Sequence, residues 1–144
     1  AVRDRKSRTT LLPAAATLHD RLAASGLHAR VFGSYGWQCV TGLEFVHEAS
    51  DLDLLMPVRQ WAEAEAIIGL LHAAGPLPRL DGEFVFGDGW GVAWREFERL
   101  SQGPTNRLLA KRVDIVALLA RADIEAALKG PCCMNVPEAA CTSA

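Results

Sequence analysis

The chain has 144 residues, of which 50% are hydrophobic and 22% are charged, and its formal net charge at pH 7 is −2. This length and composition predict one globular domain with its own core, and they exclude a disordered chain. The slightly negative charge argues against general binding of nucleic acid, and no apolar run is long enough to span a membrane.

The first ten residues carry a basic cluster but no apolar segment of the kind found in secretory signals. The cluster contains Arg3, Arg5, Lys6 and Arg8 against one acidic residue, Asp4. It is suited to a phosphate-bearing ligand or an acidic protein partner, or it is a solvated terminus. The four cysteines have no metal-binding spacing, so we expect reduced thiols in a cytoplasmic protein.

Helical and strand periodicities alternate along the chain. The first half is predicted to contain a helix over residues 14–25, a short strand HARVF, a tight turn at Gly33 and Ser34, a short helix beginning in YGWQCVTG and a strand SDLDLLMPV. The second half is predicted to contain a helix in RQWAEAEAIIGLLHAAG, a hairpin EFVFGDGWGVAWREF, a strand RLLAKRVDIVALL interrupted near Lys111, and a helix ADIEAALKG.

This order of elements predicts an α/β (α+β) domain with one mixed sheet flanked by helices. The domain is expected to cover residues 1–130. Residues 131–144 show no periodicity and are expected to form a loose tail.

Asp51 and Asp53 interrupt an otherwise apolar strand. Side chains alternate along a strand, so both carboxylates are expected on one face while Leu52 and Leu54 point into the core. Ionised carboxylates are costly to desolvate unless a cation meets them. Paired carboxylate oxygens suit Mg²⁺, whose coordination is often completed by substrate phosphates, and Gly33 and Ser34 are placed to bind such a phosphate.

A strand that ends in Gly-Ser, followed by D-x-D within a second strand, resembles the nucleotidyltransferase superfamily, which has the polymerase-β-like fold. A closer resemblance rests on GSYGWQCVTG, SDLDL, RLDGE, VAWRE and a following lysine, in this order between about residues 30 and 112. These motifs are similar to those of the malonate decarboxylase holo-acyl carrier protein synthases, also called phosphoribosyl-dephospho-coenzyme A transferases. That family has a substantial N-terminal portion, which we expect to be absent here.

The resemblance implies an enzyme that transfers the phosphoribosyl-dephospho-CoA group from triphosphoribosyl-dephospho-CoA to a serine of the malonate decarboxylase acyl carrier subunit, releasing pyrophosphate. It assigns catalysis and Mg²⁺ binding to Asp51 and Asp53, and triphosphate binding to Gly33 and Ser34. Two other functions stay open. One is a different small nucleotidyltransferase, of the toxin–antitoxin or antibiotic-modifying type, and the other is a non-catalytic nucleotide-binding remnant.

Further site residues are less sharply defined by the sequence. Arg95 and Lys111 are candidates for binding phosphate oxygens, or are charges at the surface of a strand. A third carboxylate is expected to be Glu83, Glu96 or Asp114, with a slight preference for Glu83 as a substrate-binding residue. Because acyl carrier proteins are acidic, the basic cluster at residues 3–8 is expected on the side of the sheet that bears Asp51.

Overall fold

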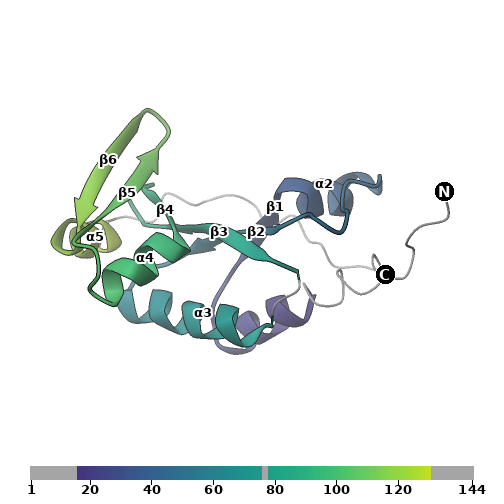
Figure 1. Cartoon of the computed structure of the whole chain (residues 1–144), viewed down its shortest axis with the longest axis horizontal. Coiled ribbons are helices and arrows are strands. Elements are labelled where there is room, and N and C mark those ends of the chain that lie inside the picture. Colours follow the sequence, from purple (N-terminus) through teal and green to yellow (C-terminus); the bar gives the residue numbers. More distant parts are fainter. Residues whose placement is uncertain (1–15, 76–77, 131–144) are drawn as a thin grey trace.

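The computed structural model describes residues 16–75 and 78–130. Within these ranges the chain forms a six-stranded sheet in the order β1-β2-β3-β4-β5-β6, with helices packed mainly against one face (Figure 1). The basic cluster at residues 3–8 and the tail 131–144 lie outside the described residues, so the expectations for them stay predictions.

The strands follow one another across the sheet in chain order. They are β1 (Arg30–Phe32), β2 (Leu52–Pro57), β3 (Leu80–Val85), β4 (Gly91–Ala93), β5 (Arg107–Arg112) and β6 (Ile115–Ala120). The helices are a first helix over residues 16–24, α2 (Gly33–Thr41), α3 (Trp61–Ala73), α4 (Trp94–Ser101) and α5 (Arg121–Leu128). Only β2 and β3 pair in parallel, because α3 carries the chain back to the same end of the sheet.

One face of the sheet is buried beneath helices. In β2, Leu52, Leu54 and Met56 are buried, whereas the intervening residues are partly exposed, as the alternation of a strand requires. The aromatic ring of Phe97 on α4 joins the layers, with its centroid 4.4 Å from that of Trp61 and 5.2 Å from that of Phe84. The opposite face, which carries Asp53, is free of these helices.

The predicted mixed α/β class is confirmed, and the arrangement is consistent with a nucleotidyltransferase-like fold. Three local expectations were wrong. Gly33 begins α2 instead of forming a separate turn, β3 begins at Leu80 instead of near Glu83, and Trp94 begins a helix instead of extending the hairpin. Trp94, Phe97 and Leu100 are buried at a spacing of three, so burial of one helix face prevailed over the apparent alternation of the hairpin.

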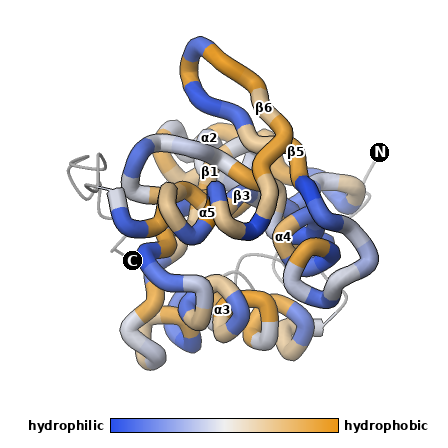
Figure 2. The backbone as a smooth tube through the Cα atoms, turned by 90° about the vertical axis from the view of Figure 1, so that its left-hand side faces the viewer, coloured by the Kyte–Doolittle hydropathy of each residue, from blue (hydrophilic) through white to orange (hydrophobic). Residues whose placement is uncertain are grey.

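The predicted interruption near Lys111 is confirmed as the turn of the antiparallel hairpin β5–β6. This hairpin projects from the rest of the domain, and apolar residues lie along β6 (Figure 2). Ile115, Val116 and Leu118 on that strand are exposed. Within residues 16–75 and 78–130, no helix combines the length and the apolar character needed to cross a bilayer.

Candidate active site

The pairing of β2 with β3 brings three aspartates to the open face of the sheet. Asp53 lies opposite Asp81, and the same offset continues to Asp51 and Arg79, because the Leu52 N–H donates to the Arg79 carbonyl at 2.9 Å. Directly paired residues point to the same side of a sheet. Asp51, Asp53 and Asp81 therefore share one face, as predicted for the first two.

Asp81 is the carboxylate that sequence reasoning missed. None of the three alternatives lies opposite Asp53 in the register. Glu83 is two residues further along β3 and pairs with Lys111 at 3.0 Å, Glu96 pairs with Arg99 at 2.9 Å on α4, and Asp114 lies in the exposed turn between β5 and β6. The signal was present in RLDGE, but Asp81 was assigned to the loop before β3.

The two aspartates of the D-x-D motif have opposite electrostatic environments. Arg79 donates two hydrogen bonds of 2.6 Å to Asp51, one to each carboxylate oxygen, and this fork lowers the pKa of Asp51. Burial raises the pKa of Asp53, and the charges of Asp81 and then Asp51 raise it further. Among the described residues no cation forms an ion pair with Asp53, so the negative charge of Asp81 makes the ionised form of Asp53 less favourable.

Gly33 lies against Asp53, one member of this carboxylate pair. Phe32 on β1 pairs with Asp53, and α2 begins directly after it at Gly33. Gly33 has a left-handed φ of 63°, and a Cβ at this position would overlap Oδ2 of Asp53. No side chain from the described part of the chain caps this end of α2, so its first N–H groups are suited to bind an anion. Of the two predicted phosphate-binding residues, Gly33 is thus next to Asp53, and Ser34 follows it in the first turn of α2.

Tyr35, on the first turn of α2, was not singled out from the sequence. Its side chain is 1% exposed, and its hydroxyl has no hydrogen-bond partner among residues 16–75 and 78–130. Burial raises the pKa of Tyr35, and the charge of Asp51 raises it further, which places the hydroxyl within electrostatic range of the site. Burying a hydroxyl without a hydrogen-bond partner costs free energy of folding. A bound group or a local rearrangement that supplied a partner would remove this cost.

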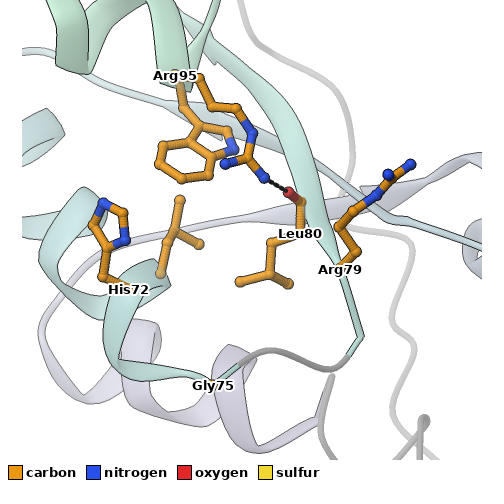
Figure 3. Close-up of a pocket in the computed structure, with 7 residues that line it drawn as sticks. His72, Gly75, Arg79, Leu80 and Arg95 are labelled. Atoms are coloured by element: carbon orange, nitrogen blue, oxygen red, sulfur yellow. Dashed lines mark hydrogen bonds between the residues drawn. The ribbon is translucent and has the colours of Figure 1, made fainter.

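The remaining predicted residues lie on two sides of the carboxylate pair. Lys111 on β5 and Glu83 form their ion pair over Gly91, where a Cβ would lie 3.0 Å from Glu83 Oε2. Lys111 is therefore already matched by a carboxylate. Arg95, on α4, donates to the carbonyl of Leu80 at 2.8 Å, at the start of β3 (Figure 3).

From the described part of the chain, the site offers a Mg²⁺ ion two carboxylates and no larger set of protein ligands. Across residues 16–75 and 78–130, no group of three or more acidic, histidine or cysteine side chains is arranged to hold a metal. In many Mg²⁺ sites, however, the protein supplies only one or two carboxylates, and water and phosphate oxygens complete the octahedral coordination. Asp53 and Asp81 provide such a pair, while Asp51 is held by Arg79.

Comparisons with known proteins identify a family for the chain. Residues 2–122 match the family model described as phosphoribosyl-dephospho-CoA transferase MdcG C-terminal domain. Proteins named phosphoribosyl-dephospho-CoA transferase are similar to the chain. One from Xanthomonas campestris pv. campestris (strain 8004) is 41% identical over 106 residues, covering 72% of this chain and 48% of the relative. One from Bradyrhizobium diazoefficiens is 40% identical over 109 residues, covering 71% and 46%.

The chain spans about half the length of these relatives. No solved structure matches the chain. The family model covers most of the sequence, and its matched residues include the D-x-D strand, Gly33, Asp81 and Arg95. The chain therefore belongs to the phosphoribosyl-dephospho-CoA transferase MdcG C-terminal domain family.

Proposed function

We propose that this domain transfers the phosphoribosyl-dephospho-CoA group from triphosphoribosyl-dephospho-CoA to a serine of the malonate decarboxylase acyl carrier subunit, with release of pyrophosphate. The observation that carries the proposal is the pair Asp53–Asp81 beside the uncapped start of α2. Carboxylates that repel each other next to free N–H groups are suited to a magnesium-bound triphosphate and unsuited to a simple apolar ligand.

Each element has a distinct task in this reaction. The N–H groups at Gly33 and Ser34 bind the leaving pyrophosphate portion, because the positive end of the α2 dipole favours an anion there. Asp53 and Asp81 would hold Mg²⁺, and Asp51 would join them if Arg79 moved to the substrate. The metal, when bound, would neutralise the triphosphate and help to align the attacking and leaving oxygens.

The chemistry itself is a substitution at phosphorus. The carrier serine hydroxyl gives up its proton to solvent, its oxygen forms a bond to the phosphorus that bears the ribosyl group, and the bond from that phosphorus to the pyrophosphate oxygen breaks. The attacking hydroxyl belongs to the partner, so the site needs no nucleophile of its own. Positioning and charge stabilisation are the main contributions that a protein makes to such a transfer.

Intact-mass spectrometry of the carrier tests the proposal. The chain is incubated with the apo carrier subunit, triphosphoribosyl-dephospho-CoA and Mg²⁺, and the expected result is a carrier heavier by one phosphoribosyl-dephospho-CoA group. Asp53→Asn should abolish the gain in mass, whereas Asp114→Asn, an equal change in the exposed β5–β6 turn, should retain it. Transfer by the Asp53→Asn variant at the rate of the unchanged chain would contradict the metal assignment.

The acidic carrier is proposed to meet the basic cluster at residues 3–8. Reversing these charges should slow association with the carrier, and raised salt should have the same effect, because exposed charges are screened over about 8 Å at physiological ionic strength. Affinity for the triphosphate substrate should change less. Carrier association that is indifferent to salt would reject this docking site and leave the catalytic assignment intact.

A further inference from the structure

Two arginines lie near the start of β3, beside Asp81 of the carboxylate pair. Arg79 and Arg95 line a hollow of about 410 Å³ together with Leu80 and Asp81. In Figure 3 the guanidinium of Arg95 reaches the Leu80 carbonyl, while that of Arg79 points away from His72 on the other side of the strand. The hollow is therefore bordered by two planar cations at the edge where β4 no longer covers β3.

Arg95 has binding capacity that the fold does not use. One of its terminal nitrogens donates to the Leu80 carbonyl at 2.8 Å, and its guanidinium carbon lies 4.4 Å from the centre of the Trp94 ring. Within the described part of the chain it makes no ion pair with a carboxylate. A guanidinium has five N–H donors in a fixed fork, so Arg95 is oriented by Leu80 and Trp94 with donors left for an anion.

Arg79 is committed in a different way. Both of its hydrogen bonds go to Asp51, but 72% of its side chain is exposed. An exposed ion pair contributes little to stability and exchanges readily with solvent or another anion. Asp81 also lines the hollow. Unlike Asp51, it accepts no hydrogen bond from Arg79, and its Oδ1 accepts the N–H of Gly82 at 2.8 Å. Of the two arginines, Arg95 therefore has unused donors, and Arg79 can exchange its exposed partner.

The position of this corner relative to the reacting group is fixed by the sheet. Across neighbouring strands the order is Gly33 after β1, Asp53 on β2 and Asp81 on β3, and Arg95 reaches the start of β3 from α4. Adjacent strands are about 4.8 Å apart. The hollow thus adjoins the carboxylate pair at Asp81, one strand further than Asp53 from β1 and the start of α2, where the leaving pyrophosphate is proposed to bind.

We infer that Arg79 and Arg95 form a second anion subsite that binds a non-reacting diphosphate group of the substrate. The inference rests on the proposed function in one respect only, since it takes the substrate to be a dephospho-CoA derivative. Such a molecule has a bridging diphosphate in the part that is transferred, separate from the triphosphate that reacts. Paired arginine forks are the side chains best matched to diphosphate oxygens.

Isothermal titration calorimetry without carrier tests the subsite by itself. Dephospho-CoA without metal presents the bridging diphosphate, and tripolyphosphate with Mg²⁺ presents the leaving portion. Arg95→Gln is expected to weaken dephospho-CoA binding about tenfold, the loss typical of one charge-assisted contact, and to change tripolyphosphate affinity less than twofold. Arg99→Gln is the matched control, because Arg99 lies on the same helix and pairs with Glu96 away from the hollow.

The outcomes separate the alternatives. If Arg95→Gln weakens only the tripolyphosphate complex, the subsite binds a diphosphate group of the leaving portion. If neither affinity changes, or if Arg99→Gln weakens binding equally, the inference is wrong. Arg95→Lys keeps the charge without the fork and should give an intermediate loss, which guards against a folding defect in the glutamine variant. A failed transfer assay combined with selective loss here would reject the proposed function and keep the subsite.

Discussion

Replacing Gly33 with alanine perturbs the candidate site at one atom. Gly33 has a φ of 63°, and the added Cβ would overlap Oδ2 of Asp53 while lying 3.2 Å from its Cγ. A left-handed backbone costs a non-glycine residue roughly 1–2 kcal/mol. Because the overlap is with Oδ2 at the end of the Asp53 side chain, rotation of the carboxylate would relieve it. That rotation would displace an oxygen that is proposed to bind the metal.

Gly42 provides a matched control at the other end of α2. Its φ is 69°, so Gly42→Ala pays the same backbone cost, but a Cβ there meets nothing within 4 Å. Both variants should therefore lose roughly 1–2 kcal/mol of unfolding free energy, or about 4 °C of melting temperature for each kcal/mol at this size. Only the change at Gly33 should displace Asp53.

The assay compares carrier modification and calorimetric binding of Mg²⁺–tripolyphosphate in the two variants. A displacement of about 1 Å in a positioning group costs about 100-fold in rate, so Gly33→Ala should lose about two orders of magnitude in transfer and Gly42→Ala very little. Equal rates and equal affinities in the two variants would refute the reasoning, because they would show that contact between α2 and Asp53 does not matter for substrate.

Three further results are expected. At neutral pH, Asp53→Asn should raise the melting temperature of the metal-free protein. The pKa of Asp53 is raised in the folded state, so the folded protein loses stability as pH rises through that pKa. Melting curves recorded across acidic pH should show this contribution in the unchanged chain and not in the variant. Tyr35→Phe should raise the unfolding free energy by about 1 kcal/mol in denaturant titrations, because it removes a buried hydroxyl without a partner; a loss would mean that the hydroxyl is bonded in solution. Gly82→Ala should prevent stable folding, as measured by circular dichroism, because Gly82 has a φ of 147° and a Cβ there would overlap the backbone of β2. The control is Gly69→Ala on α3, where a Cβ meets nothing within 4 Å, and it should stabilise the protein by about 0.5–1 kcal/mol. A folded Gly82→Ala variant would contradict the observed register.

Local sequence determined most of the elements, because their signals lie within a few residues. Apolar residues at helical spacing marked α3, and the alternation in SDLDLLMPV marked β2 with Asp51 and Asp53 on one face. The proximity of Gly33 to this strand followed from the Gly-Ser and D-x-D motifs and their family resemblance. Gly33 and Asp53, two of the residues proposed to be at the centre of the chemistry, could therefore be named from the sequence alone.

Only tertiary structure decided which carboxylate completes the pair and which cation binds Asp51. Asp81 lies opposite Asp53 and Arg79 opposite Asp51 because β2 and β3 pair in parallel at a fixed offset. That register is set by how α3 packs beneath the sheet and by the absence of a side chain at Gly82, neither of which leaves a local periodicity in the sequence. Trp94 likewise fits a strand by local alternation, and it starts a helix because burying one face with Phe97 against the core is more favourable.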